Sequence, residues 1–182
     1  MTVPHALHPR SLANKRLLLT RRFRTVRQTL LQLGQQTLGG QLGATMVLHT
    51  WDQTRKAHFH RHCLGPAGAL AEDGPRWVPT PPRCLLPVWA LRTVCRAKCL
   101  TALPQASNTE AWRWAQVSAR CDASTGFPHL LDQLSTQAWG GYAQRPGAGP
   151  TQGLDSLGRS LHRVAMAHHR LLEGRDGRGR CT

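Results

Sequence analysis

The chain has 182 residues, which is enough for one domain with a hydrophobic core and does not require a second. Its formal net charge of +15 favours a polyanionic partner such as DNA or RNA, although GC-rich coding DNA would also give an arginine-rich chain. No stretch approaches the roughly 20 apolar residues of a membrane span and no secretory signal is present, so we expect a cytoplasmic protein without a membrane partner.

The first predicted element is a basic helix over residues 11–38, stopped by Gly39 and Gly40. Leucines, Phe23 and Val26 recur at three- and four-residue steps, which is typical of a helix with one apolar side. Arginines fill much of the remainder. They fit either a solvated face or a face that contacts phosphates, and the pattern leaves both interpretations open.

A second group of elements follows, with two strands separated by a polar turn. We predict strands at 44–51, 57–64 and 76–78, a loop at 65–75, and a helix at 86–103 that ends at Pro104.

The C-terminal part mixes helices and strands, so the fold class is predicted as α+β. We predict a helix at 127–137 starting near Pro128, a strand at 139–144, a helix at 151–161, and a strand or helix extension at 163–172. From Gly174 the chain is rich in Gly and Arg and is predicted to be disordered.

Six cysteines are present, but none form a CxxC pair. Cys95 and Cys99 are four residues apart and would share one helix face. A zinc site needs a second pair at ligand spacing, so reduced and unpaired cysteines are the favoured interpretation.

Histidines alternate at His58, His60 and His62. In a strand, residues two apart point to the same face, so three imidazoles would line one surface. Such a row could hold a divalent metal ion, with His49 on the neighbouring strand as a further donor. The alternative is a set of exposed histidines without a function.

Two long sequence blocks, which follow each other along the chain, carry a resemblance to a known protein family. Residues 45–77 contain VLHTWDQ, HFHRHCLGPAGAL and DGPRW, and residues 139–172 contain WGGYAQRP and LDSLGRSLHRVAMAHHRLL. These blocks resemble the two-tyrosine, HUH-type transposases of rolling-circle insertion sequences, whose patterns read VLHTWGQ…HPHxHCVVPGGGL…DGxRW and WVVYAKPP…LxYLGRYTHRVAISNHRLL. Weaker similarity extends the match to about residues 7–173.

The resemblance implies a fragment of an HUH-type antiparallel sheet with flanking helices. Residues 1–173 would be a partial HUH domain, without the family's zinc-binding N-terminal region and first strand, and residues 174–182 a disordered tail. His60 and His62 would hold Mg or Mn. The residue between them is normally apolar and buried. Here it is Arg61, and the cost of burying a guanidinium predicts a weakened site or a local shift.

The larger departure from the family lies in its nucleophiles. The two tyrosines of the YLGRY helix correspond to Ser156 and Ser160. A serine hydroxyl is shorter and far less acidic than a phenol, so both positions are expected to be inactive. Tyr142, the one tyrosine of the chain, matches a different family position and is expected to be structural.

Three functional hypotheses remain beside that of an active enzyme. The favoured one is a transposase remnant that binds DNA, in particular single-stranded insertion-sequence ends, without transferring strands and without a small-molecule substrate; such a protein would be nucleoid-associated when bound. The others are an inert reading frame from a decayed element, and a generic basic nucleic-acid-binding protein. An active enzyme would need a serine nucleophile or a partner's tyrosines.

Overall fold

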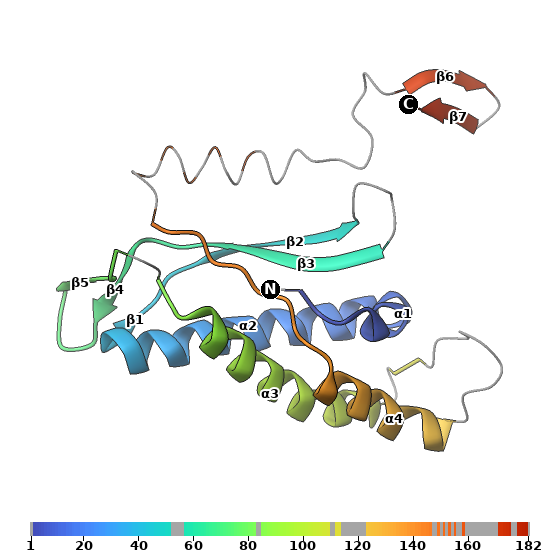
Figure 1. Cartoon of the computed structure of the whole chain (residues 1–182), viewed down its shortest axis with the longest axis horizontal. Helices are drawn as coiled ribbons and strands as arrows, with labels where there is room; N and C mark the ends of the chain where they lie inside the picture. The colour runs from blue at the N-terminus through green and yellow to red at the C-terminus, as the bar shows by residue number, and fades with distance from the viewer. Residues whose placement is uncertain are drawn as a thin grey trace.

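A computed structural model of the chain describes residues 2–51, 57–82, 85–109, 112–113, 123–146, 149, 151, 153, 155, 158, 171–175 and 178–181. A two-stranded ladder lies over a long helix, a second helix packs beside that helix, and a third packs against the second and against the N-terminal 3-10 turn (Figure 1). The mixture of helices and antiparallel strands confirms the α+β fold class. None of the helices in these ranges is both long and apolar enough to cross a membrane.

The predicted N-terminal helix is present but broken. A 3-10 turn, η1 (His5–Leu7), leads into α1 (His8–Ala13), and α2 (Lys15–Leu38) follows after Asn14. The Asn14 amide donates to Arg113 O at 2.7 Å, and its Oδ1 accepts from Arg113 N at 2.6 Å. This tertiary contact gives Asn14 a non-helical backbone, which sequence periodicity does not reveal. Gly39 ends α2 at φ 62°, a left-handed conformation that favours glycine.

Both predicted central strands are confirmed. Strand β2 (Thr45–Trp51) pairs antiparallel with β3 (Ala57–Leu64), in a register that sets His49 opposite His60 and Leu48 opposite Arg61. On its other edge β3 meets Thr2 through an isolated bridge at His60, and Thr2 also bridges Gly140. The N-terminal segment therefore occupies part of the second edge of β3.

A small sheet lies beyond the end of α2, in the order β1–β4–β5. It consists of β1 (Gly40–Gln41), β4 (Gly68–Ala71) and β5 (Trp77–Pro79), so the prediction of a strand near 76–78 is confirmed. The prediction of a loop throughout 65–75 is wrong. Strand β4 is short and carries Gly and Ala, which have low strand propensity. A Cβ on Gly68 would lie 2.5 Å from Val78 O, so only glycine allows this close pairing.

Two helices extend past prolines that were expected to bound them. Helix α3 (Val88–Ser107) contains Pro104, and α4 (Ala123–Thr136) contains Pro128. Pro104 lies in the last turn of α3, where its carbonyl still accepts from Asn108 N at 3.2 Å. A proline removes one backbone donor, and the bonds on either side of it can keep the helix intact.

Later elements differ more from the sequence-based expectation. The strand predicted at 139–144 is reduced to the Gly140 bridge, because Thr2 is the partner available to it in the described structure. Thr151, Gly153, Asp155 and Gly158 are helical, as predicted for 151–161, and most of 163–172 lies outside the described residues. Strands β6 (Leu171–Arg175) and β7 (Arg178–Cys181) pair antiparallel; β6 begins at the end of the predicted strand or helix extension, and β7 lies in the Gly- and Arg-rich segment after Gly174.

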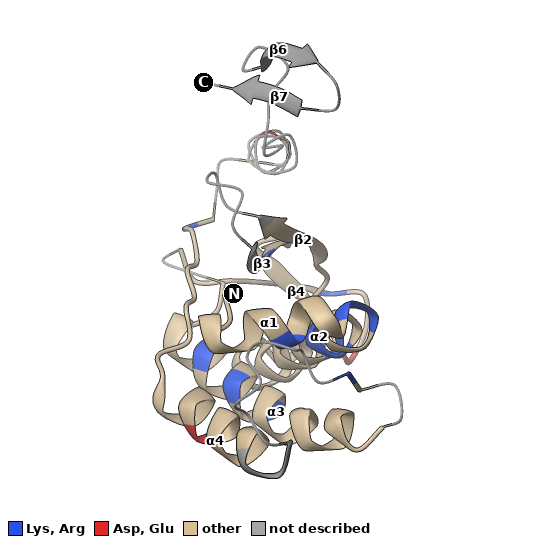
Figure 2. Cartoon of the chain, turned by 90° about the vertical axis from the view of Figure 1, so that its right-hand side faces the viewer, with Lys and Arg blue, Asp and Glu red and all other residues tan. Residues whose placement is uncertain are grey.

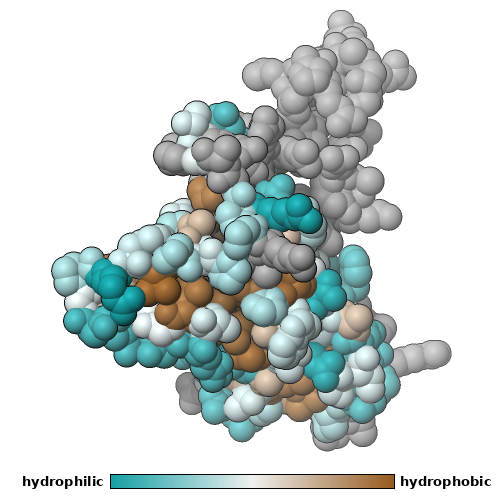
Figure 3. All heavy atoms as spheres, turned by 60° about the vertical axis from the view of Figure 1, so that its left-hand side comes forward, coloured by the Kyte–Doolittle hydropathy of each residue, from teal (hydrophilic) through white to brown (hydrophobic). Residues whose placement is uncertain are grey.

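The core has two clusters. The larger joins η1, α2, α3 and α4 to the underside of β3 around Phe59, and the smaller joins the end of α2 to β4 and the start of α3. Apolar residues also reach the surface as a band across the face in Figure 3. The large exposed apolar side chains are Leu12, Leu70, Trp77, Trp89 and Tyr142.

Candidate metal centre

Three histidines converge on the face of the β2–β3 ladder that points away from α2. His49 stands directly opposite His60 across the ladder, and His62 lies two residues further along β3 on the same face. The ring centroids are 5.1 Å apart for His49 and His60, 4.6 Å for His49 and His62, and 5.0 Å for His60 and His62. We call these three residues the histidine triad.

The triad is close to the geometry that a metal ion requires. One ring nitrogen from each histidine lies within 4.8 Å of the other two, and all three side chains are half-buried. Metal–nitrogen bonds of about 2.1 Å bring two ligand atoms to at most about 4.2 Å from each other. Small rotations of the rings close this difference, so the triad fits a divalent cation with open positions facing outward.

The alternation of His58, His60 and His62 is confirmed as a strand pattern, because all three lie in β3. The side chain of His58 lies outside the described part of the chain. The structure brings His49, the further donor expected on the neighbouring strand, into the group. Cross-strand register, which is invisible in a local motif, is what selects His49.

Arg61 points to the opposite face of β3 and is buried, with 4% of its surface exposed. Its Nη2 donates to Leu19 O at 3.1 Å, and its guanidinium lies 4.5 Å from the centre of the Phe23 ring. Burial lowers the pKa of Arg61 to about 10. The ladder register is continuous through Arg61, from Thr45–Leu64 to His49–His60, and shifts just beyond the triad, between His49 and Trp51.

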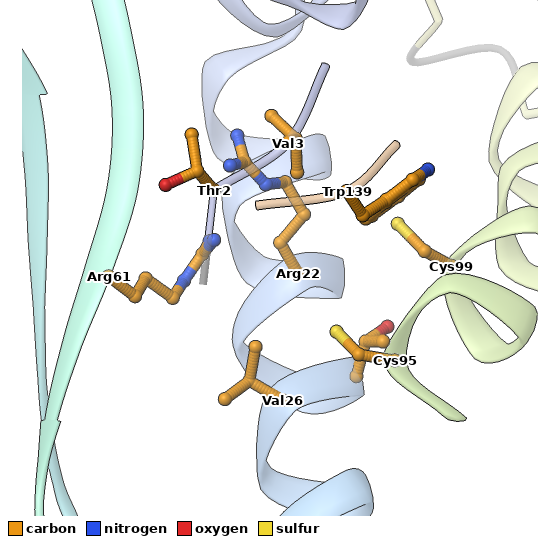
Figure 4. A pocket seen from close by; sticks show the side chains of 9 residues that line it. Thr2, Val3, Arg22, Val26, Arg61, Cys95, Cys99 and Trp139 are labelled. Carbon is orange, nitrogen blue, oxygen red and sulfur yellow. The ribbon is translucent and has the colours of Figure 1, made fainter. Parts of the chain in front are cut away.

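A second buried arginine, Arg22 of α2, faces Arg61 from below the sheet (Figure 4). Only 3% of Arg22 is exposed, and its Nη2 donates to Phe59 O at 3.1 Å. Burial and then the charge of Arg61 lower the pKa of Arg22 to about 9. Sequence reasoning missed this residue, although Arg22 stands four residues after Leu18 and four before Val26, in the buried stripe of α2.

The predicted nucleophile positions, Ser156 and Ser160, lie outside the described residues. The helical residue Gly153 lies near the end of β3, because a Cβ built on it would be 3.3 Å from Leu64 Cδ1. Tyr142 is 82% exposed and takes no part in the described core, so the structure does not support a packing role for it.

The basic residues of α2 divide into two kinds. Arg22 is buried, and Arg21 is half-buried with its Nη1 3.4 Å from Ala102 O. Arg16, Arg24 and Arg27 are exposed. Figure 2 shows this basic surface on α2, below the strands. Since α2 packs under β3, these exposed arginines lie across the sheet from the triad.

Comparisons with known proteins give a consistent result. Residues 43–178 match a protein family described as "Putative transposase". A curated relative, named "Putative transposase y4qJ" in Sinorhizobium fredii (strain NBRC 101917 / NGR234), is 33% identical over 178 residues, which are 97% of this chain and 45% of that protein. The chain thus spans about half the length of the curated relative. No solved structure matches it.

Proposed function

This chain belongs to the two-tyrosine transposase family, and we propose that it binds single-stranded DNA through a divalent cation held by His49, His60 and His62. The DNA would be the ends of a rolling-circle insertion sequence. The observation that carries the proposal is the convergence of three imidazoles on the outer face of the ladder. The net charge of +15 adds a field that attracts phosphates.

The donor set also bears on the metal. Imidazole nitrogens suit borderline transition metals better than Mg²⁺, which prefers oxygen ligands and gives up water reluctantly. Between the two ions expected from the family resemblance, the triad therefore favours Mn²⁺. A bound cation would polarise a phosphodiester and offset the charge of its oxygens.

The residues of the chain would then hold the DNA without cutting it. The triad would hold a cation that supplies positive charge to one phosphate, while exposed arginines such as Arg24 and Arg27 would raise the local concentration of DNA by long-range attraction. Ser156 and Ser160 stand where the family has its tyrosines. Their hydroxyls are short and weakly acidic, so we propose that no covalent protein–DNA intermediate forms.

Metal binding by the triad is tested by titrating Mn²⁺ into the full chain and following the NMR signals of the histidine rings. The His49, His60 and His62 signals should broaden first, while His129, which is exposed on α4, keeps its linewidth at the same Mn²⁺ concentration. Replacement of both His60 and His62 by Ala should remove the selective broadening of His49, and a His129→Ala variant should retain it. Equal broadening of His129 and the triad would contradict the proposal.

DNA binding is tested with a labelled single-stranded oligonucleotide across a salt series, with and without Mn²⁺. Affinity should fall steeply with salt because each neutralised phosphate releases counterions. Mn²⁺ should raise affinity for the wild type and not for the double variant. No denaturant-resistant adduct should appear on gels. An adduct lost on changing Ser156 or Ser160 to Ala would instead establish a serine nucleophile.

A further inference from the structure

A small cavity lies on the inner side of β3, between that strand, α2 and α3. Polar groups line it from all three elements, with Arg61 reaching down from β3, Arg22 and Thr25 coming from α2, and Cys95 and Cys99 from α3. Figure 4 shows both guanidinium groups directed into this space. No part of the histidine triad takes part, since the triad occupies the other face of the strand.

Arg22 brings unused hydrogen-bond donors to the cavity. Its Nη2 donates to Phe59 O, but its Nε and Nη1 are buried and have no hydrogen-bond partner in the structure. A buried donor without an acceptor is costly, and more so on a charged group. The position of Arg22 therefore calls for an acceptor inside the cavity.

The charge of Arg22 also lacks a counter-charge among the described residues. With pKa values lowered only to about 9 and about 10, Arg22 and Arg61 both stay protonated at neutral pH. Among the described residues, no carboxylate makes an ion pair with Arg22; the pair found there joins the exposed Arg76 and Asp73. Burial raises the pKa of Cys95 and of Cys99, the latter to about 12, so neither thiol supplies a negative charge.

We propose that the cavity binds a small monovalent anion of halide size between Arg22 and Arg61. Its free volume of about 10 Å³ is close to the space that one water molecule needs, so a single-atom anion fits better than phosphate or sulfate, which carry four oxygens each. A water molecule would satisfy the donors of Arg22 but would leave its buried positive charge uncompensated. An anion would accept from the donors of Arg22 and would also balance its charge. The side chain of Thr25 lines the same cavity.

The anion is tested by ³⁵Cl NMR on the full chain, at constant ionic strength set with gluconate, because a chain of charge +15 also attracts chloride non-specifically. The wild type should show a saturable broadening of the chloride signal that bromide displaces. Arg22→Met should lose the saturable part. Arg27→Met removes one exposed charge from the same helix and should retain it. Equal saturable broadening in Arg22→Met and Arg27→Met would overturn the assignment.

A second measurement needs no variant and so does not depend on the folding of Arg22→Met. Crystals of the wild type grown in bromide should give one anomalous peak between the Arg22 and Arg61 guanidiniums. A water-like peak without anomalous signal at that position, at bromide concentrations that saturate the displacement experiment, would overturn the proposal.

Discussion

The two faces of β3 are built from alternate residues of one strand and lie in different environments, one half-buried and the other fully buried. The outer face carries His60 and His62, half-buried and within reach of His49. The inner face carries Phe59 and Arg61, both almost fully buried against α1 and α2. Neighbours in sequence therefore serve a candidate metal site on one side and the core on the other, and a substitution at one residue should leave the other face largely intact.

The comparison also shows where charge is tolerated. Imidazoles on the outer face keep access to solvent and to a metal ion, so their polar atoms have partners available. On the inner face, Arg61 depends on the Leu19 carbonyl, the Phe23 ring and the cavity. Polar groups there persist only because specific partners surround them.

Phe59→Ala tests the inner face most severely. Phe59 is 1% exposed, packs within the larger cluster and makes an edge contact with His8 at 5.4 Å between ring centres. Truncation of a buried Phe costs about 3–5 kcal/mol of the free energy of unfolding. Urea denaturation measures the loss. Phe127→Ala is the control, since Phe127 is only partly buried and should cost less; equal costs would mean that the underside of β3 is not the centre of the core.

Arg61→Leu should act in the opposite direction. Leucine restores an apolar residue at this buried position and removes one of two neighbouring cations. Replacement of buried charges by apolar residues is often neutral or stabilising by about 1–4 kcal/mol. We expect a gain in the free energy of unfolding by urea denaturation, and a larger gain in chloride-free buffer, where no halide offsets the repulsion between Arg61 and Arg22.

The matched control for Arg61→Leu is Arg27→Leu, which removes the same charge from an exposed position of α2. Its effect should stay within about 0.5 kcal/mol, as is usual for surface substitutions. A loss of stability in Arg61→Leu beyond that of the control would show that the contacts of Arg61 with Leu19 and Phe23 outweigh its burial.

Much of the outer face could be predicted from sequence, because its signal is local. Alternation predicts β3 and the common face of His60 and His62, and the same rule places Arg61 on the buried side. The resemblance to two-tyrosine transposases adds the metal and the missing nucleophiles. His49 was also named from the sequence, and the register of β2 is what sets it directly opposite His60.

The inner face was much less predictable, because its contacts join distant parts of the chain. The helix break at Asn14 depends on Arg113, and the burial of Arg22 depends on Phe59. In a basic helix, one arginine on the apolar stripe is difficult to recognise among several that are exposed. Strand β4 was missed since its pairing depends on tertiary contacts rather than on propensity.

His60→Ala is the smallest expected effect and tests the outer face most directly. Without metal, the substitution removes a half-buried imidazole and leaves the β3 backbone pairing with β2 and Thr2 unchanged. The free energy of unfolding should therefore change by no more than about 0.5 kcal/mol. Addition of Mn²⁺ should stabilise the wild type, because a ligand that binds only the folded state adds to its stability, and should not stabilise His60→Ala. His129→Ala should behave as the wild type in both conditions. A large loss of unfolding free energy in metal-free His60→Ala would mean that the histidines contribute to folding itself. The outer face of β3 would then be part of the stabilising core as well as a candidate metal site.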